Sequence, residues 1–367
     1  MTEHNTCCRC GQTFTGTPVM MDDDPLCERC AEEETVLCSR CGERIYRDDN
    51  AGDENLPLCQ SCYENHYYSC DHCGRIIHQN DAYYACDDED DEYPLCYTCY
   101  SSRGKAIQDY YYKPEPLFRG DGPRYFGVEL EIDGAGEDGE SASEIMEIAN
   151  SNGLENLYCK HDGSLDDGFE MVTHPMTLDY HRNEMPWKEI LHSAVQMGYT
   201  SHQAGTCGLH IHVNRNAFGE TEREQDAVIA RILFFFEKNW EELLKFSRRT
   251  QSQLNHWAAR YGYKDQPKEL LDHAKKGNAG RYTSVNLTNT NTIEFRIFRG
   301  TLKYNTLIAT LQLLDRICDV ALFLSDDQIK EMSWTTFISG CTAPELVQYL
   351  KERRLYVNEP VESEGEI

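Results

Sequence analysis

The chain has 367 residues, of which 63 are acidic and 35 basic, so its formal net charge is −28. This balance argues against a general nucleic-acid or anionic-membrane binder, because phosphates attract basic surfaces. The first residues carry no apolar leader, and the longest compact apolar run, Ile232 to Phe236, is too short to span a bilayer. We therefore expect a soluble, cytoplasmic protein with neither nucleic-acid nor membrane partners.

Twelve of the 18 cysteines form six Cys-x-x-Cys pairs, all before residue 100. They make three repeated units: Cys7/Cys10 with Cys27/Cys30, Cys38/Cys41 with Cys59/Cys62, and Cys70/Cys73 with Cys96/Cys99. Four thiolates in two such pairs make a closed tetrahedral Zn²⁺ site, and units this short need metal to fold. We expect three zinc-stabilised units in residues 1–100 rather than disulfides, with sequential or cross-braced ligand pairing both open.

The spacing of these cysteines resembles zinc-ribbon and LIM-type fingers, although the histidine typical of LIM domains is missing. Two interpretations of the module remain open. It docks a peptide or protein partner, or it is a purely structural cap.

The prolines and glycines in residues 101–123 predict a linker. It would precede a second domain at 124–355. An acidic tail at 356–367 is expected to follow that domain. Hydrophobic patterning predicts helices over about 178–197, 222–246, 304–324 and 343–353. The polar stretch 251–280 is expected to form a mobile loop or lid.

Strict alternation predicts that Phe126–Asp133 is a strand with aliphatic residues on one face and Glu129 and Glu131 on the other. Gly208–Asn214 repeats this pattern and presents His210, His212 and Asn214 from one face. Other strands are expected at 168–175, with Glu170, at 281–287, and at 292–300, with Glu294 and Arg296.

Placed in one sheet, these strands gather carboxylates, imidazoles and an arginine on one face. Such a cluster of carboxylates is unstable by itself because like charges repel one another. Mg²⁺ and Mn²⁺ are the cations that suit carboxylate-rich sites. Arginines at the same place indicate an anionic substrate. Together they favour ATP-dependent chemistry, although the chain has no Walker loop.

The order of the motifs is specific. Glu-x-Glu, Asp-Gly-Ser, Gly-Leu-His-x-His-x-Asn, Arg-Tyr-x-x-x-Asn and Glu-Phe-Arg follow one another between about residues 124 and 317. This series resembles the amidoligase family, within the glutamine synthetase and γ-glutamylcysteine ligase superfamily. The resemblance implies an α+β fold, with a curved antiparallel sheet backed by helices. It also implies that ATP activates a carboxylate as an acyl phosphate, which an amine then attacks to give an amide.

The resemblance assigns roles to the residues that match its motifs. Glu129, His210 and Glu294 would hold the metal that bridges the ATP phosphates. Glu131 and Glu170 would hold a second metal, with one carboxylate fewer than the glutamine synthetase pattern has.

The remaining matches concern the nucleotide and the reacting groups. His212, Asn214 and Asn286 would contact phosphate or nucleotide, and Asp162 with Ser164 would shape the amine side, with Asp162 as a proton acceptor. Three arginines would stabilise charge on the γ-phosphoryl group: Arg296 first, then Arg281 and Arg299.

Two other functions fit parts of the sequence. A metal-dependent hydrolase would use the same carboxylates and histidines without a nucleotide. A non-catalytic adaptor would use the zinc units for binding and carry a degenerate ligase domain. The sequence names neither the acid nor the amine, and it leaves the oligomeric state open.

Overall fold

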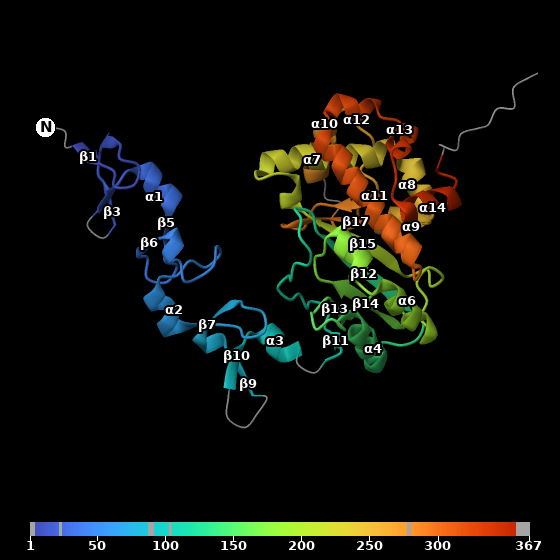
Figure 1. Ribbon diagram of the computed structural model, residues 1–367, viewed down its shortest axis with the longest axis horizontal. Helices are drawn as coiled ribbons and strands as arrows, with labels where there is room; N and C mark the ends of the chain where they lie inside the picture. Colours follow the sequence, from blue (N-terminus) through green and yellow to red (C-terminus); the bar gives the residue numbers. More distant parts are fainter. Residues whose placement is uncertain (1–3, 22–23, 87–91, 103–104, 277–279, 357–367) are drawn as a thin grey trace, which may run out of the picture. The chain divides into compact units, whose positions relative to one another are not determined.

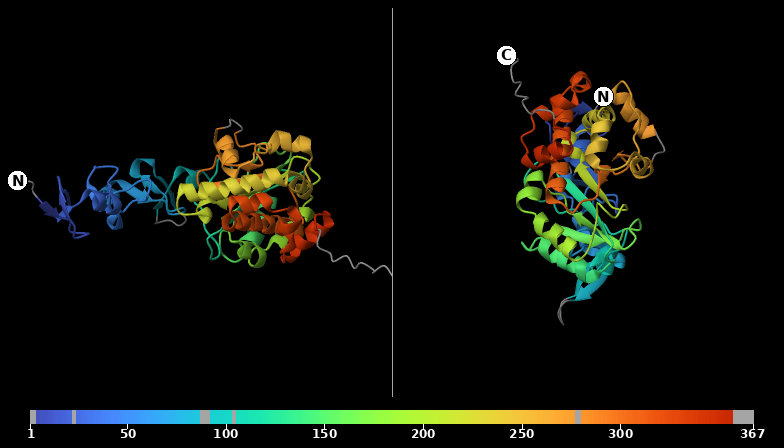
Figure 2. Two further views of the ribbon diagram at one scale, coloured as in Figure 1. Left: turned by 90° about the horizontal axis from the view of Figure 1, so that it is seen from above. Right: turned by 90° about the vertical axis from the view of Figure 1, so that its right-hand side faces the viewer.

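A computed structural model describes residues 4–21, 24–86, 92–102, 105–276 and 280–356. Contacts between residues divide the chain into two units. The first comprises residues 1–104 with 113–115, and the second comprises residues 105–112 with 116–367. Figures 1 and 2 show the elements of each unit.

The first unit repeats one small design three times, in which short antiparallel strand pairs are followed by a helix of six or seven residues. Gly11, Gly42 and Gly74 have φ values of 68°, 76° and 72°, which is the left-handed region that favours glycine. This conformation explains the glycine after each leading cysteine pair. The elements are β1 (His4–Thr6), β2 (Thr13–Thr15), β3 (Val19–Met21), β4 (Asp24–Leu26), α1 (Glu28–Glu34), β5 (Thr35–Leu37), β6 (Arg44–Tyr46), η1 (Arg47–Asp49), α2 (Gln60–His66), β7 (Tyr67–Ser69), β8 (Ile76–His78), η2 (Gln79–Asp81), β9 (Tyr83–Cys86), β10 (Glu92–Leu95) and α3 (Tyr97–Ser102).

The second unit is built on a seven-stranded sheet of order β11-β13-β14-β12-β15-β17-β16. Every neighbouring pair is antiparallel except β11 with β13. The strands are β11 (Ile107–Gln108), β12 (Phe126–Asp133), β13 (Leu157–Lys160), β14 (Gly168–Thr173), β15 (Gly208–Asn214), β16 (Val285–Asn286) and β17 (Thr292–Arg299). Because β11 pairs with β13 and Arg119 bridges to Met176, much of the expected linker packs on this unit.

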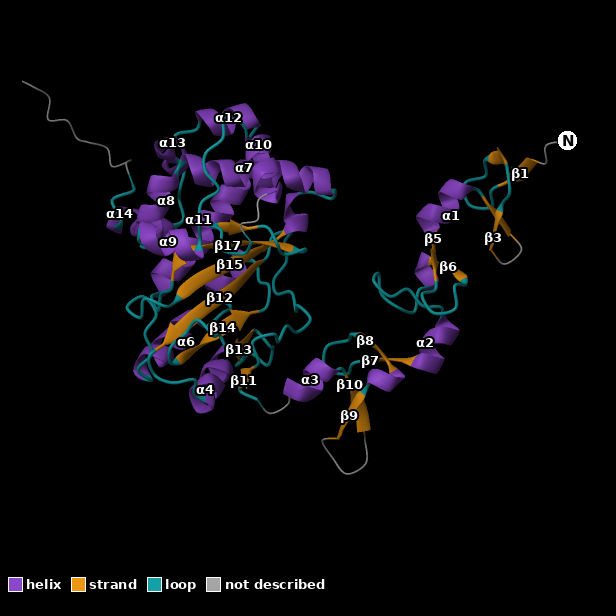
Figure 3. Cartoon of the chain, turned by 180° about the vertical axis from the view of Figure 1, so that it is seen from behind, coloured by secondary structure: helices purple, strands orange, loops and turns teal. Residues whose placement is uncertain are grey.

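Helices cover the aliphatic face of this sheet. Val128, Leu130 and Ile132 are 0% exposed and share one core with residues of the covering helices. Figure 1 shows α11 crossing the sheet, and Figure 3 shows the strands from the opposite side. The predicted α+β class, a sheet backed by helices, is therefore confirmed. The helical elements are α4 (Gly139–Ala149), α5 (Leu178–Asn183), α6 (Trp187–Gln196), η3 (Arg215–Phe218), α7 (Glu222–Lys238), α8 (Trp240–Ser247), α9 (Gln251–Trp257), α10 (Pro267–Lys276), α11 (Tyr304–Phe323), α12 (Asp326–Glu331), α13 (Trp334–Ser339) and α14 (Pro344–Glu352).

Several predicted elements differ from the structure. The helix expected over 178–197 is two helices, because Pro186 lacks the N–H that a continuous helix needs. The helix expected over 222–246 is interrupted at Asn239, whose side-chain amide donates to the Phe235 carbonyl 3.0 Å away. The expected loop at 251–280 contains α9 and α10, and the strand expected at 281–287 is only Val285–Asn286.

No helix within the described ranges is long and apolar enough to cross a membrane. The expected acidic tail lies outside the described residues from residue 357 onward.

Candidate functional site

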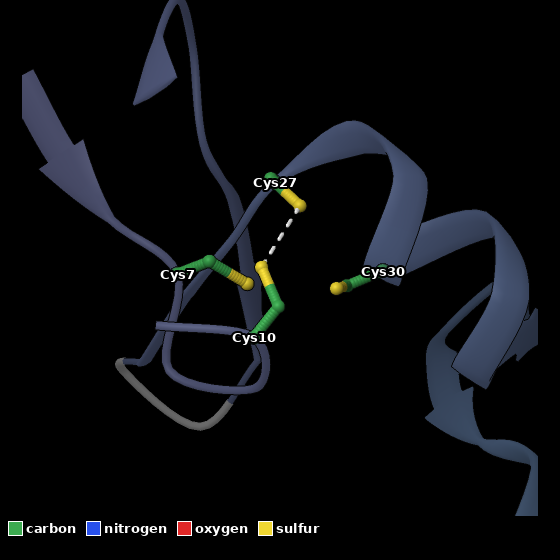
Figure 4. Close-up of side chains that lie close together, drawn as sticks. All are labelled: Cys7, Cys10, Cys27 and Cys30. Atoms are coloured by element: carbon green, nitrogen blue, oxygen red, sulfur yellow. Dashed lines mark hydrogen bonds between the residues drawn. The ribbon is translucent and has the colours of Figure 1, made fainter. Parts of the chain in front are cut away.

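Each of the three cysteine units brings four sulfur atoms together. In every unit these atoms lie within 4.8 Å of one another, and each set comes from one repeat. Figure 4 shows Cys7, Cys10, Cys27 and Cys30 converging from a turn and from the start of α1. The ligand sets are therefore sequential, which decides against the cross-braced alternative.

The spacing of the sulfur atoms fits zinc. Cys10–Cys27, Cys41–Cys59 and Cys73–Cys96 have Sγ···Sγ distances of 3.9, 3.8 and 3.9 Å, far longer than a disulfide bond. A tetrahedron with Zn–S bonds of about 2.3 Å has edges of roughly 3.8 Å. The twelve cysteines are thus compatible with three closed zinc sites.

Backbone amides favour the thiolate at the first cysteine of each unit. Hydrogen bonds from the amides of Cys10 and Cys27 lower the pKa of Cys7 to about 6. For Cys38 and Cys70 burial opposes ionisation, but amide hydrogen bonds from the same knuckles outweigh it and lower the pKa to about 6 and about 7. Since the thiolate is the metal ligand, the leading cysteine of each repeat is prepared for a cation. The closing knuckles differ, because hydrogen bonds with neighbouring thiols raise the pKa of Cys30 to about 12 and burial raises that of Cys62 to about 12.

The second unit gathers a polar cluster on the sheet face opposite the helices. Antiparallel pairing sets Glu129 opposite His210, Glu131 opposite Glu170, and His212 opposite Glu294. Directly opposite residues in a ladder have neighbouring side chains on one face. The predicted convergence of these strands is therefore present in the geometry.

Two overlapping groups of ligand atoms lie in this cluster. One contains Glu129, His210 and Glu294, the other contains Glu131, Glu170 and His210, and within each the atoms lie within 4.8 Å of one another. His210 Nδ1 lies 3.5 Å from a Glu129 carboxylate oxygen and 3.9 Å from oxygens of both Glu131 and Glu294. His210 is thus common to both groups.

Three carboxylates of the cluster are buried and that of Glu129 is half-buried, and neighbouring groups shift the pKa values of Glu129 and Glu170 in opposite directions. Burial and the charge of Glu129 raise the pKa of Glu170 well above its usual range. Burial also opposes ionisation of Glu129, but the charges and hydrogen bonds of His212 and His210 outweigh it and hold its pKa well below the usual range. His212 Nε2 lies 3.0 Å from Glu129 Oε1.

These residues fit divalent cations. Glu131, Glu170 and Glu294 are 4%, 3% and 4% exposed, so their negative charges are largely withdrawn from water. Carboxylate oxygens and an imidazole are ligands that Mg²⁺ and Mn²⁺ accept, and a cation would remove the repulsion that raises the pKa of Glu170.

Side chains around Glu294 fix its orientation. Asn286 Nδ2 donates to Glu294 Oε2 at 2.7 Å, and Asn289 Nδ2 donates to the same oxygen at 3.4 Å. Arg296 forms an ion pair with Glu294 Oε1, and its guanidinium carbon lies 5.9 Å from the centre of the Tyr282 ring. The predicted residues Asn286 and Arg296 therefore both touch a candidate metal ligand.

Some predicted residues neither belong to the two groups of ligand atoms nor form a hydrogen bond or ion pair with a member of them within the described residues: Asp162, Asn214, Arg281 and Arg299. Asp162 is half-buried in the turn after β13 and accepts from the Ser164 N–H at 2.7 Å. Asn214 accepts from the Tyr125 N–H and donates to the Pro123 carbonyl. Arg281 donates to the Tyr110 hydroxyl at 2.7 Å, and Arg299 lines a separate cavity. Their predicted contacts with substrate or nucleotide stay predictions.

Two site residues escaped the sequence reasoning. Lys160 Nζ lies 3.3 Å from Glu170 Oε2, and alternation along β13 could have placed it on the same face. Arg249 follows α8 in a loop, and no sequence pattern indicated that its guanidinium would lie near His210 beside Gly208.

A family model described as "Putative amidoligase enzyme" matches residues 151–318. This range contains Glu170, His210, Glu294 and Arg296, whereas Glu129 lies before it. The match confirms the resemblance that the motifs predicted. The matched segment, which is less than half of the chain, is similar to amidoligases. No curated protein matches the chain.

Two solved structures are distantly similar. A bifunctional glutathione synthetase from Pasteurella multocida is 14% identical with a TM-score of 0.34, and the match covers 63% of this chain and 46% of that one. The complex between the prokaryotic ubiquitin-like protein Pup and its ligase PafA gives 11% identity and a TM-score of 0.27, covering 63% and 56%. The chain thus spans about half the length of these proteins.

Proposed function

We propose, from the similarity of residues 151–318 to amidoligases, that the protein uses ATP to join a carboxylate to an amine. The γ-phosphoryl group would pass to the carboxylate, which breaks its bond to ADP and gives an acyl phosphate. The amine then attacks the acyl carbon and phosphate leaves. The observation that carries this proposal is the pair of adjoining ligand groups that share His210.

The residues of the cluster suit the charges of this reaction. Glu129, His210 and Glu294 would hold one Mg²⁺ or Mn²⁺ ion, and Glu131 with Glu170 would hold another. When bound, such ions neutralise phosphate oxygens and orient the two reacting groups. His212 Nε2 lies 3.0 Å from Glu129 Oε1, so His212 would position that ligand as well as contact phosphate.

Cationic side chains beside the ligands would stabilise the transferring group. Arg296 now pairs with Glu294. If Glu294 turns to a metal ion, the guanidinium becomes available to the phosphoryl oxygens. Lys160 pairs with Glu170 in the same way at the other group. Asp162, which is half-buried in its turn, is proposed to accept a proton from the amine.

The zinc module is proposed to dock a peptide or protein substrate. In its third repeat Tyr83, Tyr84, Tyr97 and Tyr100 are 40%, 46%, 65% and 44% exposed. The Tyr83 ring lies 5.5 Å from that of Tyr97 and 5.2 Å from that of Tyr100. Grouped exposed tyrosines are typical of protein interfaces, since each offers apolar area and a hydroxyl.

The test measures ADP and phosphate release in the presence of ATP, Mg²⁺, and pools of carboxylates and amines. Release should require both pools and should fall at least about 100-fold in Glu129→Gln, as expected when an essential electrostatic group is lost. Glu147→Gln, on the exposed side of α4, is the matched control. Turnover by Glu129→Gln at the wild-type rate would overturn the site assignment. Hydrolysis that needs metal but no nucleotide would favour a hydrolase instead.

A further inference from the structure

A second charged site lies at the end of the sheet where β15 begins and β17 ends. It is a cavity of about 540 Å³ lined by His202, Glu241, Leu244, Lys245, Arg248, Arg249, Arg299 and Arg353. Five of these eight side chains are cationic in a chain whose net charge is −28. Leu244 is the only aliphatic member, so the lining is suited to charged ligands rather than apolar ones.

Packing within the protein explains only two of the five cations. Arg353 donates through Nε and Nη2 to the Lys245 carbonyl at 3.0 and 2.7 Å, and Lys245 Nζ donates to the Arg354 carbonyl at 3.0 Å. These bonds cap the ends of α8 and α14, as cations near helix C-termini do.

The other three arginines lack an anionic partner. Within the described part of the chain, Arg248, Arg249 and Arg299 form no ion pair. Glu241 is the one acidic residue of the lining, and it stands within ion-pair distance of none of them. Unpaired guanidinium groups directed to one cavity are a preformed site for carboxylate or phosphate oxygens.

The backbone has an unfavourable left-handed conformation at two positions beside the cavity. Arg248 and Arg354, with φ values of 61° and 53°, are the only non-glycine residues with positive φ in the described ranges. Arg248 lines the cavity itself, whereas Arg354 is the residue after Arg353, which also lines the cavity. For side chains other than glycine this conformation costs about 1–2 kcal/mol. The turn at Arg248 places Arg248 and Arg249 against one cavity.

Several positive charges lie near His202. Burial, followed by repulsion from Arg248, Arg299, Lys303 and Arg353, lowers the pKa of His202 to about 4. This agrees with the geometry, because a cluster of unpaired cations resists another positive charge.

The cavity adjoins the ligand cluster. A Cβ on Gly208 would lie 2.7 Å from a guanidinium nitrogen of Arg249 and equally 2.7 Å from His210 Nε2, so these two groups are neighbours. The Gly208 N–H in turn donates to the Glu131 carboxylate. A substrate that extends away from Glu131 and His210 would therefore meet the arginines.

We propose that this cavity binds an acidic peptide segment with two or more carboxylates, as part of the carboxylate substrate of the ligase. The inference rests on the proposed function, because it names the substrate class of that reaction. Arg248, Arg249 and Arg299 bind carboxylates other than the one that reacts, and so position the reacting carboxylate beside Glu131 and His210. A cavity of this volume accommodates a short peptide segment, whereas a single carboxylate would leave guanidinium groups unpaired.

The first experiment measures binding alone, without ATP or Mg²⁺, by calorimetry with a tri-glutamate peptide. A tri-glutamine peptide is the neutral control and inorganic phosphate is the competing anion. Arg248→Asn and Arg299→Gln should each weaken tri-glutamate binding at least tenfold. Asparagine tolerates the left-handed conformation, so Arg248→Asn removes the charge without a folding penalty. Arg354→Asn makes the same change at the same φ region outside the cavity and should bind as the wild type does.

The outcomes separate the two proposals. Binding of tri-glutamate that Arg248→Asn abolishes supports the inference even if no turnover is found, in which case only the proposed function fails. Equal binding by the wild type and Arg248→Asn, or phosphate binding at least as tight as that of tri-glutamate, overturns it. In a working ligase assay, Arg248→Asn should raise the KM of the acidic substrate about tenfold with the KM of ATP unchanged. An equal rise in both would overturn the assignment.

Discussion

His181 shows how a single buried side chain makes the second unit sensitive to pH. It is 0% exposed, its Nε2 lies 3.0 Å from the Phe126 carbonyl, and its Nδ1 accepts from the Trp187 indole at 3.3 Å. If Nδ1 were protonated, its N–H would face the indole N–H of Trp187, so two donors would meet without an acceptor. Burial lowers its pKa from 6.5 to about 4.

The sign of the pH effect follows from that shift. Between pH 6.5 and 4 the unfolded chain binds the proton and the folded chain does not, so stability is complete above pH 6.5 and falls as the pH decreases. At pH 4.5 this residue should cost about 2–3 kcal/mol relative to pH 7.5. We predict that His181→Gln, which keeps a donor and an acceptor, removes that part of the loss in urea unfolding at the two pH values. An unchanged pH dependence in the variant would contradict it.

Gly208 is a second position where a small change should affect the site, because an added Cβ would collide with site side chains. A Cβ there would come within 2.7 Å of Arg249 and His210, whereas a Cβ on Gly127, on the neighbouring strand β12, would make an ordinary contact of 3.5 Å with His212 Cβ. We predict that Gly208→Ala lowers kcat/KM at least tenfold, because both side chains must move, with the melting temperature nearly kept. Gly127→Ala tests whether a methyl on any strand glycine has this effect. Equal losses in both variants would show that Gly208 has no special role.

Among the elements, the segment 251–280 is held to α7 by Glu237. This carboxylate is 3% exposed, accepts from Arg260 Nε at 2.8 Å, and accepts from the Tyr261 N–H at 2.7 Å. Because a buried carboxylate anchors the chain at Arg260 and Tyr261, the mobile loop or lid expected for 251–280 is not free there. We predict that Glu237→Gln, which weakens charge-assisted bonds to a buried acceptor, costs about 2 kcal/mol and speeds proteolysis within 251–276. Glu147→Gln should leave both unchanged. A variant as stable and as resistant as the wild type would show that other contacts hold the segment.

The sequence predicted the strands and their faces best, because the alternation of polar and apolar residues directly reports which side chains share a face. Alternation in Phe126–Asp133 and Gly208–Asn214 predicted which side chains share a face, and the observed register brings Glu129 and His210 together. It failed where a single residue interrupts a period, as Pro186 and Asn239 do. Arg249 could not be found, because its place depends on how the loop after α8 crosses the end of the sheet, and no local pattern encodes that.

At the scale of the whole molecule, the two units have different sources of stability. The second unit has one large apolar core, whereas each cysteine repeat has a small core in which cysteines make up a large part, such as Cys38, Leu58 and Cys59 in the second repeat. A repeat with so few buried apolar side chains cannot offset the chain entropy of folding without metal. Loss of zinc should therefore unfold the repeats and spare the sheet.

We predict that the purified protein contains three zinc ions and that a zinc chelator at neutral pH releases all of them. Limited proteolysis with mass spectrometry should then cut within residues 4–102, while residues 116–356 stay resistant, since their core contains none of the clustered cysteine ligands. Cys62→Ser should lower the content to two zinc ions because it removes one thiolate of a closed site. Cys8→Ser, an exposed cysteine outside the tetrads, should keep three. Proteolysis of 116–356 after chelation, or full zinc content in Cys62→Ser, would contradict the division of the chain into a first unit that needs metal to fold and a second unit that folds around its own apolar core.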